Sequence, residues 1–131
     1  AIFSFLEQNN LPTEDLGKDT QRFWMICDGD QILSVIGIET YGPYGLLRSM
    51  ATRRDIRNKG LAGQLVEVLI EHARQKQMID VFLLTTTAEK FFSGQGFVKV
   101  SRESAPDVIK GCREFTHLCP SSAVLMKKER L

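Results

Sequence analysis

The chain has 131 residues, of which 43% are hydrophobic and 25% are charged, and its net charge is +1. These values are typical of one folded domain with an ordinary core, so we expect a single domain over residues 1–131. The small net charge argues against nucleic acid as a partner, and the apolar runs are too short to span a membrane.

The three cysteines, Cys27, Cys112 and Cys119, are an odd number, which favours reduced thiols in a cytoplasmic protein over a disulfide framework. Cys112, His117 and Cys119 lie close together in the sequence, but a structural zinc site requires four ligands and the fourth is missing. We therefore expect no metal site.

The first half of the chain predicts an antiparallel meander of three strands with tight turns at residues 28–30 and 41–45. The strands are expected at residues 22–27, 31–40 and 46–52. Residues 1–8 have the pattern of the end of an amphipathic helix. The sequence begins at Ala1 without a methionine, so we expect that a short N-terminal piece is missing. No strand is visible before residues 1–8, so either the chain begins inside that helix or a preceding strand has been lost.

A basic loop over residues 53–59 leads into an amphipathic helix over residues 60–76, on which we expect His72 to be solvated. The first turn of a helix has unpaired N–H groups that attract an anion, and Gly60 and Ala62 leave room for one to approach. The loop adds positive charge from Arg53, Arg54, Arg57 and Lys59. These features predict a phosphate-binding site, and the alternative is a solvated surface loop.

A strand over residues 81–85 should pair in parallel with residues 46–52, because a helix connects them. Thr86 or Thr87 is expected to cap a helix over residues 88–94. The remaining elements are a strand over residues 97–101, a helix over 104–117, and a last strand over 123–127 that pairs with 97–101.

The loop and helix start carry Arg57-Asn58-Lys59-Gly60-Leu61-Ala62, or R-x-x-G-x-A, and neither the P-loop nor the dinucleotide fingerprint occurs. This motif resembles the acetyl-CoA pyrophosphate loop of the GNAT N-acetyltransferase superfamily. The resemblance extends over residues 23–128 and includes AEKFFSGQGF at 88–97. It implies an α/β fold with a mixed sheet: an antiparallel meander, then a parallel β-α-β unit whose central strands splay apart around the pantetheine arm.

The resemblance also implies that acetyl-CoA is the co-substrate. Backbone groups of Met50, Ala51 and Thr52 would hold the pantetheine arm, and one of their N–H groups would face the thioester carbonyl. The pyrophosphate would lie on the backbone of Arg57, Asn58, Lys59, Gly60, Leu61, Ala62 and Gly63.

The sequence departs from the family at the group that protonates the leaving thiolate. Many members have a tyrosine five residues before the phenylalanine of Gly-Phe, and this chain has Phe92 there. Another group, a water molecule or the ammonium product would then protonate the sulfur, or the protein does not catalyse. Glu39 and Glu89 are the candidate bases for the amine, and the alternative for each is a surface charge.

Three segments narrow the resemblance to two branches, the arsenic-operon N-acetyltransferases and the acetyltransferase domain of N-acetylglutamate synthase. The segments are LLRSMA at 46–51, LLTTTAEKFFSGQGF at 83–97 and APDVIKGCREFTHLCPSS at 105–122. Both branches imply a small amino-acid-like amine as the acceptor. Arg113 would pair with its carboxylate, and Thr85, Cys119 and Ser121 would line the pocket; alternatively, Arg113 pairs with a surface acid such as Glu114.

Three functional hypotheses remain open. The first is an acetyl-CoA-dependent N-acetyltransferase of a small amine, as a monomer or homodimer. The second is a non-catalytic acyl-CoA-binding module, a sensor or structural piece, which Phe92 favours. A protein-lysine acetyltransferase has less support, because no acidic groove for a basic peptide is visible in the sequence.

Overall fold

A computed structural model describes residues 21–53, 55–56, 60–111 and 123–129. The helix expected at residues 1–8 and the question of a strand before it lie outside these residues. Among the helices that are described, none is both long and apolar enough to cross a bilayer.

The expected meander is present, and its strands are β1 (Gln21–Asp28), β2 (Gln31–Tyr41) and β3 (Tyr44–Thr52). Gly29 and Gly42 lie in the two turns at φ of 59° and 61°, a conformation that glycine adopts without steric cost. The second turn is shorter than expected, because β3 already begins at Tyr44.

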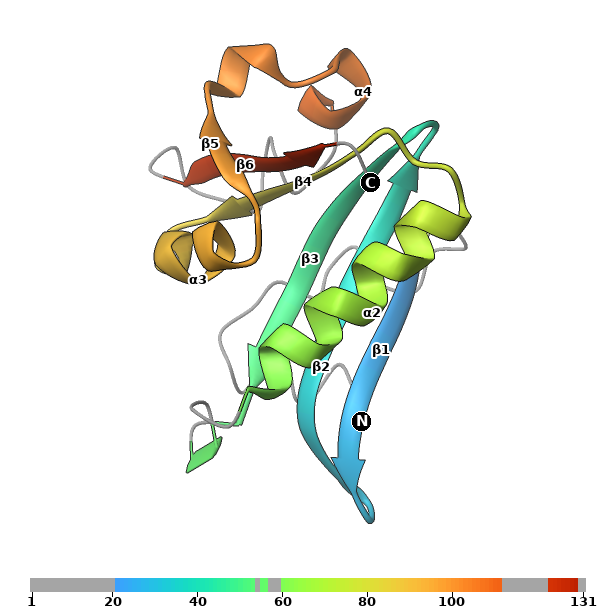
Figure 1. Cartoon of the computed structure of the whole chain (residues 1–131), viewed down its shortest axis with the longest axis vertical. Coiled ribbons are helices and arrows are strands. Elements are labelled where there is room, and N and C mark those ends of the chain that lie inside the picture. Colours follow the sequence, from blue (N-terminus) through green and yellow to red (C-terminus); the bar gives the residue numbers. More distant parts are fainter. Residues whose placement is uncertain (1–20, 54, 57–59, 112–122, 130–131) are drawn as a thin grey trace.

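The six strands of the described residues form one mixed sheet in the order β1-β2-β3-β4-β6-β5 (Figure 1). β4 (Asp80–Thr85) runs parallel to β3, and α2 (Leu61–Gln75) connects them, as the sequence predicted. β6 (Val124–Glu129) pairs with β5 (Val98–Val100), which confirms that expected pair. β6 also pairs along its length with β4 and therefore lies inside the sheet, not at its edge.

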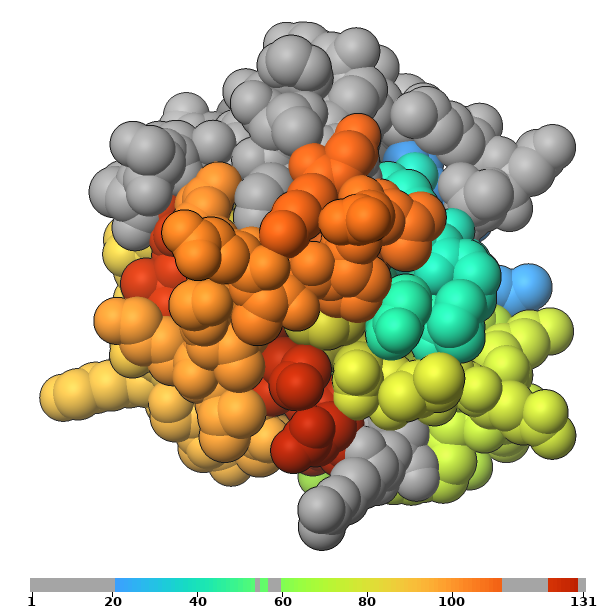
Figure 2. Space-filling view, turned by 90° about the horizontal axis from the view of Figure 1, so that it is seen from above, coloured from blue at the N-terminus to red at the C-terminus, as the bar shows by residue number. Residues whose placement is uncertain are grey.

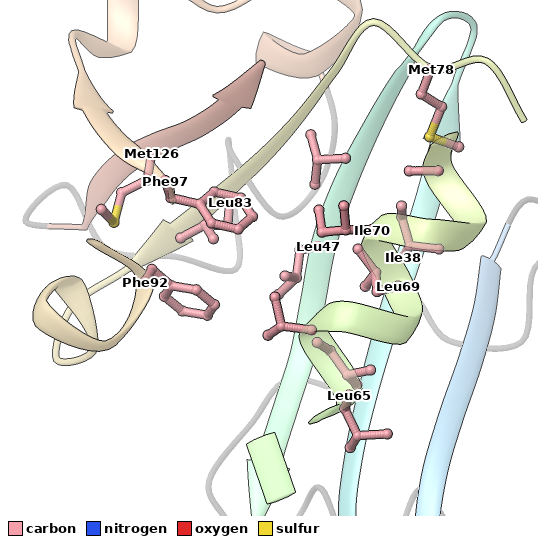
Figure 3. Packing of buried hydrophobic residues seen from close by; sticks show 14 residues of the cluster. Ile38, Leu47, Leu65, Leu69, Ile70, Met78, Leu83, Phe92, Phe97 and Met126 are labelled. Carbon is pink, nitrogen blue, oxygen red and sulfur yellow. The ribbon is translucent and has the colours of Figure 1, made fainter. Parts of the chain in front are cut away.

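Two hydrophobic clusters cover opposite faces of the sheet. Leu47 of β3 belongs to the cluster built with α2 and α3 (Glu89–Gly94), whereas its neighbour Leu46 belongs to the cluster built with α4 (Asp107–Lys110). Successive strand residues point to opposite faces, so α4 lies on the face opposite α2 and α3. Figure 3 shows the larger cluster, with Leu65, Leu69 and Phe92 directed into it.

The smaller cluster joins the two halves of the sheet at one end. Ile109 of α4 is fully buried there against Leu46 and Phe82, with Tyr41 and Tyr44 of the β2–β3 turn packed beside them. Figure 2 looks onto this end of the molecule and shows the orange α4 region in contact with the cyan β2–β3 turn. This end therefore holds β3 and β4 together.

Two local predictions were wrong. The hydroxyl at the start of α3 comes from Thr85, whose Oγ1 accepts a hydrogen bond from the Ala88 N–H at 3.0 Å, and not from Thr86 or Thr87. The helix expected from Ser104 begins only at Asp107, because Pro106 has extended backbone at ψ of 150°. A 3-10 turn, η2 (Arg102–Ser104), precedes it. Residues 112–117 lie outside the described part of the chain.

Candidate active site

The central strands of the sheet separate after a short parallel ladder. Only Tyr44, Gly45 and Leu46 of β3 pair with β4, and the last pair joins Leu46 to Phe82. β3 then continues to Thr52 while β4 turns toward β6, as Figure 1 shows. The splay that the resemblance implied is therefore present. Among the described residues, it leaves the second half of β3 without a hydrogen-bonded strand on the side of β4, and we call this unpaired side the gap.

A β-bulge lies in β3 directly beside this gap. Arg48 pairs with Gly37 of β2 and Ala51 pairs with Val35, so Ser49 and Met50 together stand opposite one residue, Ile36. Ser49 has a φ of 58°, which costs a residue other than glycine about 1–3 kcal/mol. The bulge adds a residue to β3 and bends it, which favours its divergence from β4.

Beyond the bulge, the backbone of β3 alternates between β2 and the gap. The N–H of Arg53 donates to the carbonyl of Leu33 at 2.8 Å, and the carbonyl of Ala51 accepts from the Ser34 hydroxyl at 3.1 Å. Ala51 and Arg53 therefore direct their backbone groups at β2. Because neighbouring residues in a strand alternate, Met50 and Thr52 direct theirs at the gap.

The side chain of Thr52 is held by a hydrogen bond to the neighbouring strand β2. Its hydroxyl lies 2.7 Å from the Ser34 hydroxyl, and both residues are buried. Because the Ser34 hydroxyl donates its one proton to the Ala51 carbonyl, the Thr52 hydroxyl is the donor in this pair. The hydroxyl pair holds this segment of β3 against β2.

The N-terminus of α2 has features that attract an anion. Gly60 is its N-cap with a φ of 79° and ψ of 9°, and among the described residues no atom beyond its chain neighbours lies within 4 Å of where its Cβ would be. The first turn contains Leu61, Ala62 and Gly63 and no acidic residue. Its N–H groups have no acceptor within the helix, and the helix dipole makes this end positive. Arg57, Asn58 and Lys59 lie outside the described residues.

Arg53 does not supply the free positive charge that we expected of it. Its guanidinium donates to both oxygens of Asp55, at 2.7 and 3.0 Å, and to Gln31 Oε1 at 2.8 Å. The hydrogen bond from Arg53 holds the pKa of the Asp55 carboxyl below its usual range. A cation paired in this bidentate way contributes little net charge to a phosphate site.

Phe92 belongs to the core. Its side chain is 3% exposed and meets Phe91 and Phe97 edge to face, at centroid distances of 5.1 and 5.6 Å. Figure 3 shows the ring directed from α3 toward β3. The position that carries a tyrosine in many related enzymes is therefore an apolar packing position here.

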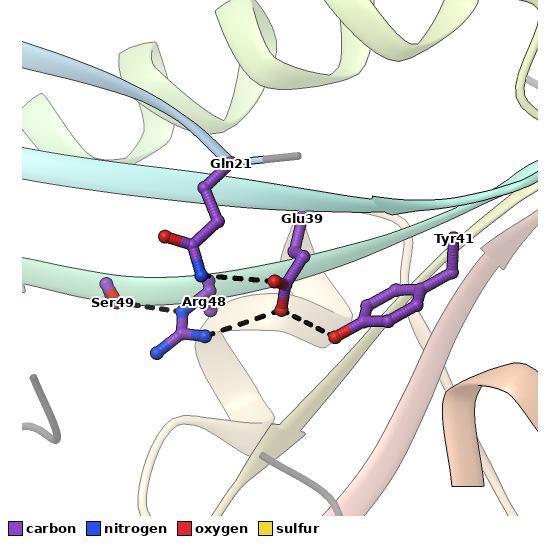
Figure 4. Close-up of polar contacts among 5 residues, drawn as sticks. All are labelled: Gln21, Glu39, Tyr41, Arg48 and Ser49. Carbon is purple, nitrogen blue, oxygen red and sulfur yellow. Dashed lines mark hydrogen bonds and ion pairs between the residues drawn. The ribbon is translucent and has the colours of Figure 1, made fainter. Parts of the chain in front are cut away.

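The two candidate bases have opposite environments. Glu39 is 3% exposed, so the alternative of a surface charge is wrong for it. Its carboxylate pairs with Arg48 Nη1 at 3.5 Å and accepts from the Tyr41 hydroxyl at 2.6 Å and from Gln21 Nε2 at 3.1 Å (Figure 4). Glu89 is exposed in the first turn of α3.

The remaining expected site residues are divided between the described and undescribed parts of the chain. Thr85 ends β4, half-buried, with its Oγ1 accepting from the Ala88 N–H. Arg113, Cys119 and Ser121 lie outside the described residues, as does the Cys112, His117 and Cys119 group considered for a metal. Within the described residues, no group of three or more metal-ligating side chains gathers.

His72 is not the simple solvated side chain that we expected. It is half-buried on α2 and meets the ring of Trp24 edge to face at 5.0 Å. Burial, followed by the charges of Arg22 and Lys76, lowers the pKa of its imidazole. This contact lies on the outer side of α2, against the edge strand β1.

Residues 3–97 match the sequence model of the Acetyltransferase (GNAT) family. The chain belongs to this family. Membership agrees with the splayed strands and the open start of α2, which are the two features expected from the motif at residues 57–62. No sequence relative of this GNAT chain was found among curated proteins.

Solved structures share the GNAT fold at low sequence identity. Rv2747 from Mycobacterium tuberculosis, in complex with CoA and NLQ, is 21% identical with a TM-score of 0.70, over 83% of this chain and 76% of that one. A GNAT-family acetyltransferase from Staphylococcus aureus Mu50 is 16% identical with a TM-score of 0.74, over 98% and 90%.

N-acetylglutamate synthase from Neisseria gonorrhoeae, complexed with coenzyme A and L-arginine, is 14% identical with a TM-score of 0.77. The match covers 98% of this chain but only 30% of the synthase. The coenzyme A in two of these three structures agrees with acetyl-CoA as the co-substrate.

Proposed function

We propose that this GNAT chain is an N-acetyltransferase that moves an acetyl group from acetyl-CoA directly to the amine of a small, amino-acid-like acceptor. The observation that carries the proposal is the gap between β3 and β4, which opens after Leu46 and Phe82. The gap runs beside backbone groups of β3 and toward the open N-terminus of α2. A long ligand with an anionic end and an amide-containing arm fits such a site.

In this proposal the pyrophosphate lies on the backbone N–H groups that follow Gly60, which attract an anion without a side-chain cation. The pantetheine arm lies along β3 and bonds the backbone of Met50 and Thr52, whose groups are directed at the gap. Ala51 contributes less than we expected from the sequence, because its carbonyl already accepts from Ser34. Arg57, Asn58 and Lys59 complete the loop.

Transfer begins when the acceptor amine, in its neutral form, attacks the thioester carbonyl carbon. A backbone N–H beside the bulge stabilises the oxyanion, and the C–S bond then breaks as the amide forms. The leaving thiolate takes its proton from water or from the ammonium that has just formed, because Phe92 is apolar and buried.

The amino-acid character of the acceptor rests on the resemblance to N-acetylglutamate synthase and on Arg113. A guanidinium binds a carboxylate in a bidentate way, and Cys119, Ser121 and Thr85 would line the same pocket. The narrower resemblance to arsenic-operon enzymes, the cytoplasmic location and a monomeric or homodimeric state remain predictions of the sequence.

Calorimetric titration with acetyl-CoA, followed by thiol release with a panel of α-amino acids and their decarboxylated amines, tests the proposal. We expect saturable binding, and faster thiol release with an amino acid than with the matching amine. Binding without release from any acceptor would favour the alternative, a non-catalytic acyl-CoA-binding module. Absence of binding would contradict both.

A further inference from the structure

A chain of polar side-chain contacts runs across β1, β2 and β3 and ends at the bulge. Tyr41 and Gln21 donate to the Glu39 carboxylate, which pairs with Arg48 Nη1 at 3.5 Å. Arg48 Nε then donates to the Ser49 hydroxyl at 3.2 Å. Figure 4 shows these side chains converging from three adjacent strands.

The position of the ion pair argues for a role beyond stability. The side chains of Arg48 and Glu39 are only 1% and 4% exposed. Removing two charges from water is costly, and an apolar pair of similar size is often at least as stable. A buried pair of this kind instead holds its side chains in one arrangement. Here Arg48 of the pair also bonds the hydroxyl of Ser49, whose φ is 58°.

The bulge decides which backbone groups face the gap. In a regular ladder that continued from the Gly37–Arg48 pair, Val35 would pair with Met50, and the Met50 backbone would be used by β2. Because Ser49 is the additional residue, Val35 pairs with Ala51 instead. Met50 is therefore shifted by one position and directs its backbone at the gap.

We propose that Arg48 is a positioning residue, which anchors the Ser49 hydroxyl and thereby holds the bulge that turns the Met50 backbone toward the acetyl thioester. Glu39 holds the guanidinium in place from the neighbouring strand. This inference rests on the proposed acetyl-CoA site. It assigns different roles to two features. The bulge positions the backbone beside the reacting carbonyl, and the N-terminus of α2 binds the distant pyrophosphate.

Arg48→Lys keeps a cation beside Glu39 but loses the Nε–H that reaches Ser49. Ser49→Ala and Ser49→Gly remove the acceptor and leave the ion pair intact, and glycine also relieves the positive φ. The matched control is Arg74→Lys, which alters an exposed Arg–Glu pair on α2, at 2.6 Å from Glu71.

We expect Arg48→Lys, Ser49→Ala and Ser49→Gly to lower kcat by at least about tenfold, because a misplaced donor at a developing oxyanion is this costly. The Kd for acetyl-CoA should rise by a much smaller factor than kcat falls, because the proposed contacts to the pyrophosphate and to the Thr52 backbone are untouched. Amide hydrogen exchange at Ala51, whose backbone is directed at β2 only in the register that the bulge sets, should become faster in all three variants. Arg74→Lys should change none of these quantities.

Unchanged kcat in folded Ser49→Ala and Ser49→Gly would overturn the inference, even if Arg48→Lys did not fold. An equal loss of acetyl-CoA binding and kcat would also overturn it, since the bulge would then support the fold of the whole site. If the parent protein turned over no acceptor, the proposed function would fail separately. Exchange at Ala51 would then decide: faster exchange in the variants supports the anchoring of the bulge, and unchanged exchange refutes it.

Discussion

The rings of Phe92 and Phe97 meet edge to face, with their centroids 5.6 Å apart and their planes at 68°. Phe92 therefore contributes packing where many related enzymes have an acid. We expect Phe92→Ala to lower the free energy of unfolding by about 3–5 kcal/mol, because it leaves a cavity in the core. Phe92→Leu should cost less and retain turnover. Chemical denaturation and steady-state kinetics measure both, and loss of turnover in a folded leucine variant would contradict this assignment.

Gly60 allows a test of the anion site that separates charge from backbone strain. Both Asp and Asn tolerate the left-handed conformation that Gly60 adopts at a φ of 79°, so both variants should fold. Gly60→Asp should abolish acetyl-CoA binding, because a carboxylate at this position repels the pyrophosphate. Gly60→Asn, of the same size and uncharged, should weaken binding less. Equal affinities of the two variants in calorimetry would show that no phosphate lies there.

Glu39 and Glu89 should respond differently to replacement by glutamine. Glu39→Gln leaves Arg48 buried without its counter-charge, so we expect a loss of about 3–5 kcal/mol in stability. Its residual activity should keep the decline of kcat/KM at low pH, because both oxygens of the Glu39 carboxylate already accept hydrogen bonds, from Gln21 and Tyr41.

Glu89→Gln is the exposed control and should change stability by no more than about 0.5 kcal/mol. If the decline at low pH disappears only in this variant, Glu89 is the base of the amine. Disappearance in the Glu39 variant would instead return Glu39 to that role.

Arg113 is the expected partner of an acceptor carboxylate. Arg113→Lys should raise KM for an α-amino acid and leave acetyl-CoA binding unchanged, because lysine lacks the bidentate geometry. Arg113→Ala should cost more, about 1.5–3 kcal/mol. The decarboxylated amine should respond to neither change. Equal effects on the two acceptors would remove Arg113 from the site.

The contact between His72 and Trp24 provides an optical readout of a titration, since Trp24 is the only tryptophan. Folding lowers the pKa of His72, so the unfolded chain binds more protons below the ordinary histidine pKa. Stability should therefore fall as the pH drops from about 7.5 to about 5.5, and His72→Gln should remove this part of the loss. Trp24 fluorescence should titrate with a midpoint below that of free histidine. A midpoint at or above that value would contradict the burial of His72.

Periodicity and turn chemistry were sufficient to predict the meander, α2 and the parallel return to β4. Asp28-Gly29-Asp30 marks a turn regardless of tertiary context, and the apolar face of α2 requires a sheet beneath it. The divergence of β3 from β4 was predicted from the resemblance to the GNAT family. A threonine cap was predicted for α3, but its N-cap is Ala88, which no side chain caps. The hydroxyl that bonds the Ala88 N–H is that of Thr85, and only the path of β4 distinguishes it from Thr86 and Thr87.

The bulge and the ion pair could not be predicted, for different reasons. A left-handed residue in a strand is usually marked by glycine or asparagine, and Ser49 carries no such mark. Glu39 and Arg48 are ordinary charged residues in the sequence, and their burial depends on the register of two strands, which no local pattern encodes. The features closest to the proposed chemistry are thus the least visible in the sequence.

The position of β6 has a consequence for how the chain reaches its native state. Its residues lie between β4 and β5, so both of those strands expose an unpaired edge until β6 is added. The ladder joins segments that are far apart in the sequence, and pairings of that kind form slowly. During synthesis, α2 and the meander can assemble on the ribosome well before Val124–Glu129 emerges. The nascent chain therefore passes through a stage in which β4 can pair with a strand of another molecule, and a chaperone that shields this edge should raise the yield of folded protein.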